Sequence, residues 1–73
     1  MSMEGRVKIR GVEWEFYEAL DYFACRTDDP VELGVKGLGI RGYHGCFDTM
    51  GKAIEVAADI SARTNPYPDE VFA

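Results

Sequence analysis

The sequence predicts an α+β fold, in which a small antiparallel sheet of three to four strands carries one C-terminal helix packed on one face. Three observations predict it: apolar and polar residues alternate in the first third, glycines punctuate the middle, and apolar residues recur at helical spacing over about 48–64. Because the chain has 73 residues, we expect one small domain, 1–73, with strands over about 6–43 and an extended tail over 65–73.

The first two strands are predicted to join at 10–11, because a two-residue turn with glycine in its second position suits a tight hairpin. This turn places Val7 opposite Trp14 and Lys8 opposite Glu13, so that an apolar residue faces an apolar one and a base faces an acid. The alternative is one long strand with a bulge at the glycine.

A second hairpin is predicted around a four-residue loop at 18–21, which pairs Tyr17 with Tyr22 and Phe16 with Phe23. One face of the paired strands is then wholly apolar. The other face carries aromatic and charged side chains, as expected for a half-buried sheet.

The same segment also fits a helix over about 13–26, which would give two helices on a smaller sheet. Phe16, Leu20 and Phe23 recur at the spacing of one helix face. However, the residues at 11–12 include no Ser, Thr, Asp or Asn to cap such a helix, so we favour strands.

The middle of the chain is predicted to contain a turn and then a short strand. The Asp-Asp-Pro run at 28–30 is interpreted as the turn that ends the first strands, because proline fixes φ and disfavours helix before it. A short strand through Tyr43 follows, in which glycines mark a bulge or the close approach of another backbone. The glycines of this region are Gly34, Gly37, Gly39, Gly42 and Gly45.

The predicted C-terminal helix over about 48–64 begins at Asp48 or Thr49, either of which can cap it, and ends before Asn65-Pro66. One stripe of this helix is apolar and partly built of small residues, which allow close packing against a sheet. The stripe consists of Met50, Ile54, Ala57 and Ile60.

Charge and apolar content exclude several classes of protein. Thirteen acidic and eight basic residues give a net charge of −5, and no block of Lys or Arg is present, so we expect no direct binding of nucleic acid. No apolar run approaches the roughly 18 residues of a membrane span, and no signal-peptide pattern is visible, so we expect no membrane contact and a cytoplasmic protein. Cys25 and Cys46 are expected to be reduced and buried.

Three patterns suggest chemistry, and in each the spacing argues against it. Residues 37–42 match the dinucleotide fingerprint G-x-G-x-x-G, but the predicted helix does not begin inside them. His44, Cys46 and Asp48 alternate and would share a strand face as metal ligands, yet no paired ligand spacing accompanies them. A nucleophilic pair of His44 with either cysteine lacks a third, orienting group. We therefore expect no cofactor, no metal and no enzymatic activity.

The remaining candidate site is the sheet face that one helix leaves uncovered. Tyrosines bordered by carboxylates suit protein recognition there, because aromatic area supplies affinity and acidic groups steer association. The alternative is a solvated face whose charges pair locally. The candidate partner-binding residues are Glu13, Glu15, Tyr17, Tyr22, Asp28, Asp29, Glu32 and Tyr43.

Together these features predict a small acidic binding protein that occupies a basic surface of a protein partner. The specific hypothesis is a phage or mobile-element inhibitor of the anti-CRISPR kind, which competes with nucleic acid for the basic groove of a bacterial defence effector. Two alternatives are a housekeeping domain that forms a homodimer through its open sheet face, and a small metal- or thiol-dependent enzyme.

Overall fold

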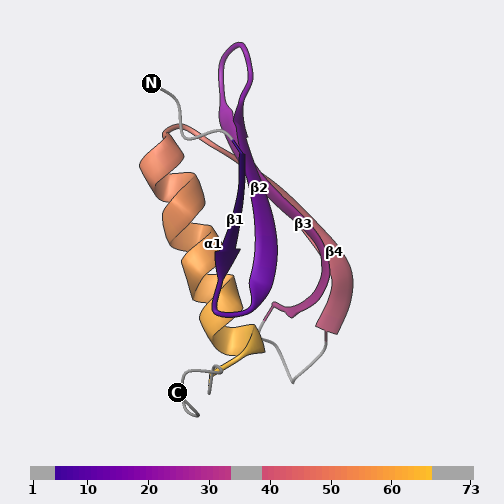
Figure 1. Cartoon of the computed structure of the whole chain (residues 1–73). Coiled ribbons are helices and arrows are strands. Elements are labelled where there is room, and N and C mark those ends of the chain that lie inside the picture. The colour runs from indigo at the N-terminus through magenta and orange to yellow at the C-terminus, as the bar shows by residue number, and fades with distance from the viewer. Residues whose placement is uncertain (1–4, 34–38, 67–73) are drawn as a thin grey trace.

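In the computed structural model, which describes residues 5–33 and 39–66, the chain forms two layers, an antiparallel sheet and a helix on one of its faces (Figure 1). The sheet is a meander whose strand order follows the chain, β1-β2-β3-β4. The predicted α+β fold is therefore confirmed. The elements are β1 (Gly5–Ile9), β2 (Val12–Glu18), β3 (Phe23–Glu32), β4 (Gly39–Phe47) and α1 (Met50–Thr64).

The turn between β1 and β2 has the predicted position and register. Val7 pairs with Trp14 and Lys8 pairs with Glu13. Arg10 has φ of 50° and Gly11 has φ of 86°, so both central residues adopt the left-handed conformation. Two successive positive φ values are what a type I′ hairpin turn requires, and glycine supplies one of them without steric cost.

Residues 13–26 form a hairpin, so the alternative of a helix is wrong. The predicted register is also wrong by two residues, because Phe16 pairs with Cys25 and not with Phe23. The loop has the predicted length but begins one residue later, at Ala19, whose N–H donates to the carbonyl of Tyr22 over 2.8 Å. A shift of two residues keeps every side chain on its predicted face, which is why the alternation of polar and apolar residues did not detect it.

The predicted turn at 28–30 is wrong, because β3 continues through it to Glu32 with a register shift between Thr27 and Pro30. Hydrogen bonds to β2 hold this irregular segment in place. The Thr27 hydroxyl donates to the carbonyl of Glu13 over 2.6 Å, and the Asp29 carboxylate accepts the N–H of Glu13 over 3.0 Å. Proline is tolerated at such a bulge, where one ladder bond is already interrupted.

β4 is longer than predicted, since it runs beyond Tyr43 to Phe47. Gly39 and Gly42 lie within this strand, and α1 begins only at Met50. Neither glycine therefore lies at a strand-to-helix turn, which is the setting that the dinucleotide fingerprint needs. Gly34 and Gly37 lie outside the described residues.

The helix begins and ends close to the predicted positions. Thr49 is the N-cap, and its hydroxyl accepts the N–H of Lys52 over 3.1 Å, while Asn65 is the C-cap. Ala57 and Ile60 of the predicted stripe are buried, and Met50 and Ile54 pack partly buried against the core. The predicted tail is described only as far as Pro66. Among the residues that the structure describes, no helix combines the length and the apolar character needed to cross a membrane.

The core lies between α1 and the covered face of the sheet. Trp14 and Phe16 of β2 are its largest members, and close contact is possible because the helix contributes alanines there. The buried apolar residues of this cluster are Val12, Trp14, Phe16, Cys25, Val31, Ala53, Ala57 and Ile60.

Candidate functional site: the open face of the sheet

The face of the sheet turned away from α1 carries mainly charged and aromatic side chains. Because side chains alternate along a strand, the residues that alternate with Trp14 and Phe16 of β2, and with Cys25 and Thr27 of β3, point to this side. Ala24 is one of them, although its small side chain is buried. The strand register then adds residues from β1 and β4 to the same surface. We call it the open face, and its residues are Arg6, Lys8, Glu13, Glu15, Tyr17, Ala24, Arg26, Asp28, His44 and Cys46.

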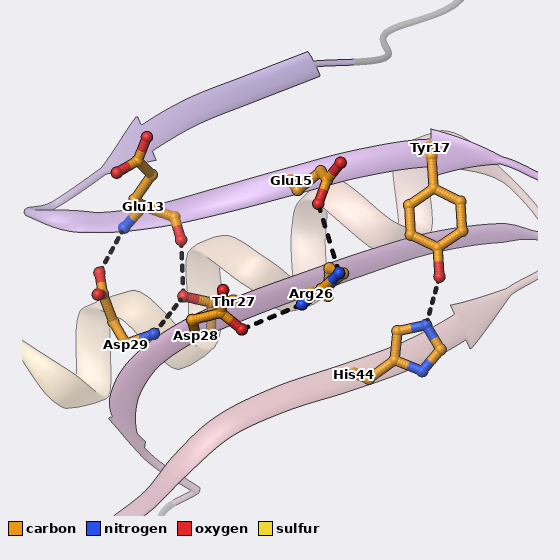
Figure 2. Close-up of polar contacts among 8 residues, drawn as sticks. All are labelled: Glu13, Glu15, Tyr17, Arg26, Thr27, Asp28, Asp29 and His44. Atoms are coloured by element: carbon orange, nitrogen blue, oxygen red, sulfur yellow. Dashed lines mark hydrogen bonds and ion pairs between the residues drawn. The ribbon is translucent and has the colours of Figure 1, made fainter.

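Arg26 occupies the middle of the open face and links two carboxylates (Figure 2). Its guanidinium lies 3.7 Å from the Glu15 carboxylate and 3.0 Å from the Asp28 carboxylate. All three side chains remain in contact with water, so these pairs contribute little to stability. Their effect is to hold the three charged groups close to one another.

Tyr17 and His44 form a second contact across the open face (Figure 2). The Tyr17 hydroxyl and His44 Nε2 are 2.6 Å apart, and the two rings lie nearly parallel and end to end, with a centroid separation of 6.1 Å and an interplanar angle of 13°. Loss of hydration is the main cause that raises the pKa of Tyr17, and nearby Tyr22 and Cys46 raise it further. The pair provides a flat aromatic area beside the charged groups.

Charge on the open face is balanced, although the sequence predicted an acidic surface. Glu13 and Glu15 lie on β2, and β1 places Lys8 and Arg6 directly opposite them. With Arg26 and Asp28 the face carries three basic and three acidic side chains. The excess negative charge of the chain therefore lies elsewhere. On the open face β1 carries a basic row, β2 carries an acidic row, and β3 contributes one residue of each sign.

Only some of the predicted partner-binding residues meet on this surface. Glu13, Glu15, Tyr17 and Asp28 do so, and the Glu13 backbone is held by Asp29, whose carboxylate is turned toward β2 (Figure 2). The Asp29 carboxylate thus has a structural partner, which sequence reasoning could not foresee because the two residues belong to different strands.

The other three predicted residues lie apart from this group. Tyr22 is in the loop between β2 and β3. Tyr43 is on the covered face, where its ring meets that of Trp14 edge-on at a centroid distance of 6.1 Å. Glu32 is at the far end of β3, where its N–H donates to the Thr64 hydroxyl over 2.8 Å.

Sequence reasoning did not assign Arg6, Lys8, His44 and Cys46 to this surface. The predicted register of the first hairpin already places Arg6 and Lys8 opposite carboxylates, so that signal was present. The two β4 residues had no comparable signal, because their side depends on the bulge in β3.

The two cysteines lie on opposite faces of the sheet. Cys25 is buried in the core, and burial raises its pKa from 9.0 to about 11. Cys46 is exposed, so the expectation that both cysteines are buried is wrong for this residue. Both are free thiols, and their side chains point in opposite directions, because Cys46 pairs with Ala24 and Cys25 pairs with Gly45.

One described cavity lies on the open face, and it is too small for a substrate molecule. This cavity of about 20 Å³, which has room for about one water molecule, lies beside Arg26 and Glu15. Within residues 5–33 and 39–66, no three His, Cys, Asp or Glu side chains converge as metal ligands. The described residues of the open face form a polar and partly aromatic surface.

No protein-family model, curated protein or solved structure matches this chain, so its function is argued from the surface itself.

Proposed function

We propose that this chain is a non-enzymatic binding protein that acts by docking its open face onto another protein. The observation that carries the proposal is the Tyr17–His44 pair beside the Glu15–Arg26–Asp28 group, on a sheet face that α1 does not cover. Aromatic rings next to charges already oriented by their neighbours are typical of protein-recognition surfaces, because less side-chain entropy is lost on binding.

The partner that we propose has a basic surface. The net charge of −5 attracts such a surface over distances of about 10 Å. On the open face itself, where the charges balance, the acidic row of Glu13 and Glu15 is the part that complements a basic surface. Basic grooves that bind nucleic acid belong to this class of surface. The specific proposal is an inhibitor that excludes nucleic acid from such a groove in a bacterial defence effector, as the size and charge of the chain led us to expect.

Self-association through the same face is the second candidate, and the alternation of charge favours it. A basic row on β1 lies beside an acidic row on β2. Two copies related by a two-fold axis can therefore oppose base to acid, which one-sided charge would prevent. Sedimentation of the purified protein at micromolar concentration separates this candidate from the first, because only self-association gives a dimer without a partner.

A charge-reversal experiment tests the proposal. The tagged protein is used to capture proteins from bacterial lysate at low and at moderate salt, and the retained proteins are identified by mass spectrometry. We compare Glu13→Lys with Glu15→Lys, made together, against Glu55→Lys with Asp59→Lys on the exposed side of α1. Each double reversal adds four charges to −5 and gives −1, so the two variants differ in position but not in net charge.

The proposal predicts that a nucleic-acid-binding protein is retained, that salt weakens its retention, and that only the reversal on the open face abolishes it. If both double reversals lowered retention of the captured protein equally, net charge alone would account for the binding. Unchanged retention with the reversal at Glu13 and Glu15 would exclude the open face as the binding site.

A further inference from the structure

The hairpin between β2 and β3 extends beyond the rest of the sheet. The last residue of β2 that pairs with β1 is Phe16, and β4 pairs with β3 only as far as Phe23. Among the described residues, Glu18 pairs only with Phe23 of the same hairpin, and residues 19–22 form the loop that joins β2 to β3. We call 18–22 the tip, and Figure 1 shows it projecting past the other strands and past the start of α1.

Leu20 lies at the end of the tip with its side chain fully in water. Its exposed fraction is 101%, compared with 40% for Val7 and 40% for Ile40. The Ala19 N–H bond to the Tyr22 carbonyl closes the loop around Leu20 and Asp21, which are its two central residues. Turns favour Gly, Asn, Asp or Pro at such positions, and leucine offers nothing to turn formation.

Neither the core nor the turn therefore explains why a leucine occupies this position. Arg10 is the only described residue other than glycine with a positive φ, so the backbone at position 20 would accept a polar residue without strain. Positions where a sequence departs from the local preference without a structural gain are often those that serve a function. A projecting hairpin that presents one large apolar side chain has the form of an anchor, because the exposed side chain can be buried in a partner without rearrangement of the core.

The charges of the tip indicate which surface such an anchor fits. Glu18 and Asp21 flank Leu20, and the segment 18–22 contains no basic residue. An acidic collar is repelled by the anionic headgroups of a membrane, and the net charge of −5 increases that repulsion. The same collar complements an apolar protein pocket bordered by lysines or arginines.

We propose that Leu20 anchors the tip in an apolar pocket with a basic rim, on the same partner protein that the open face contacts. This inference rests on the proposed function and adds a second contact to it. The two contacts are continuous along the chain, because Tyr17 of the open face directly precedes the first residue of the tip. Insertion of a single anchor next to a flat polar surface concentrates binding energy in one residue.

Substitutions at exposed apolar positions test the anchor. The capture from bacterial lysate is repeated with Leu20→Ser, with Leu20→Met, and with Val7→Ser and Ile40→Ser as controls that also remove an exposed apolar side chain. Each variant is also mixed with vesicles of phosphatidylcholine and phosphatidylglycerol and sedimented. Circular dichroism verifies folding, which we expect to be unchanged for Leu20→Ser because its side chain has no covered surface to lose.

We expect Leu20→Ser to lower the amount of the captured partner at least about tenfold, and Leu20→Met and the two controls to leave it within about twofold. If Leu20→Ser captured as much of the partner as the wild-type protein does, the proposed anchor would be wrong, while the proposal for the open face would still stand. No retained protein with the wild-type chain would overturn the proposed function, and the anchor with it. Vesicle binding that Leu20→Ser abolishes would overturn the protein pocket in favour of a membrane.

Discussion

Trp14 donates its indole N–H to the hydroxyl of Ser61 over 2.6 Å, and neither residue is exposed to solvent. Trp14 belongs to β2 and Ser61 to the last turns of α1, so the bond joins the two layers inside the core. A tryptophan in a dry interior needs a partner for its N–H, because an unpaired buried donor costs more than the bond itself contributes. The serine on the packed face of the helix therefore fixes where α1 lies on the sheet.

Ser61→Ala is expected to lower the free energy of unfolding by about 1–3 kcal/mol, because it leaves the indole N–H without a partner. Urea denaturation at neutral pH measures the change. Trp14→Phe combined with Ser61→Ala removes donor and acceptor together, and its cost is expected to be smaller than the sum of the two single substitutions. Strictly additive costs would contradict the coupling between the two residues.

Two glycines are compared to test why the turn between β1 and β2 needs glycine at position 11. Gly11 has φ of 86°, and a Cβ there would lie 3.1 Å from Asn65 Nδ2, so Gly11→Ala is expected to cost about 1–3 kcal/mol of stability. Gly51 is exposed in the first turn of α1, where a Cβ meets nothing nearer than Thr49 Oγ1 at 4.0 Å. Gly51→Ala is therefore expected to stabilise the protein by about 0.5–1 kcal/mol. Thermal denaturation of both variants measures these changes in stability. If both substitutions destabilised the protein, or both stabilised it, the different roles given to Gly11 and Gly51 would be contradicted.

Local patterns were sufficient for the parts of the fold that depend on neighbours in sequence. The turn at Gly11 and the cap at Thr49 are such cases, because the residue types themselves favour the conformations. The register of the second hairpin is different. Alternation repeats every two residues, so it fits pairing of Phe16 with Phe23 as well as the observed pairing with Cys25.

The irregular segment of β3 and the composition of the open face depend on contacts between strands. Pro30 indicates a turn when read alone, but two hydrogen bonds keep the segment in the sheet: the Thr27 hydroxyl donates to the Glu13 carbonyl, and the Asp29 carboxylate accepts the Glu13 N–H. The register shift that results decides the sides to which Tyr43 and His44 point. A single sequence contains no local signal for such a shift, so the aromatic pair on the open face could not be derived from it.

The two thiols are expected to differ in accessibility. Cys46 is exposed and Cys25 is buried, so Ellman's reagent added to the native protein at pH 8 is expected to label one thiol per chain rapidly. The second thiol is expected to react only after a denaturant is added. Cys46→Ser is expected to abolish the rapid labelling of the native protein and to leave the labelling that follows addition of denaturant. Rapid labelling of two thiols in the native protein would show that the core around Cys25 opens readily.

Stability is expected to fall at alkaline pH through Cys25, whose pKa is raised from 9.0 to about 11 by burial and, to a lesser extent, by Cys46. Below pH 9 the thiol is protonated in the folded and the unfolded chain, and its contribution is complete. Between pH 9 and 11 the unfolded chain releases the proton while the folded chain retains it, so the free energy of unfolding decreases by about 1.4 kcal/mol per pH unit. Tyr17 and Tyr43, whose pKa values are also raised by burial, add losses in the same direction near pH 10.

Comparison with Cys25→Ala isolates the thiol, because the tyrosines are common to both proteins. With Cys46→Ser in each to prevent disulfide exchange, urea denaturation at several pH values is expected to show that Cys25→Ala loses less stability than the parent between pH 9 and 11. The difference is expected to amount to at most about 2–3 kcal/mol over that interval, because Cys46→Ser removes the smaller of the two causes that raise the pKa of Cys25. Parallel pH profiles would mean that Cys25 is hydrated in the folded chain, since only a thiol kept from water in the core resists ionisation in this way.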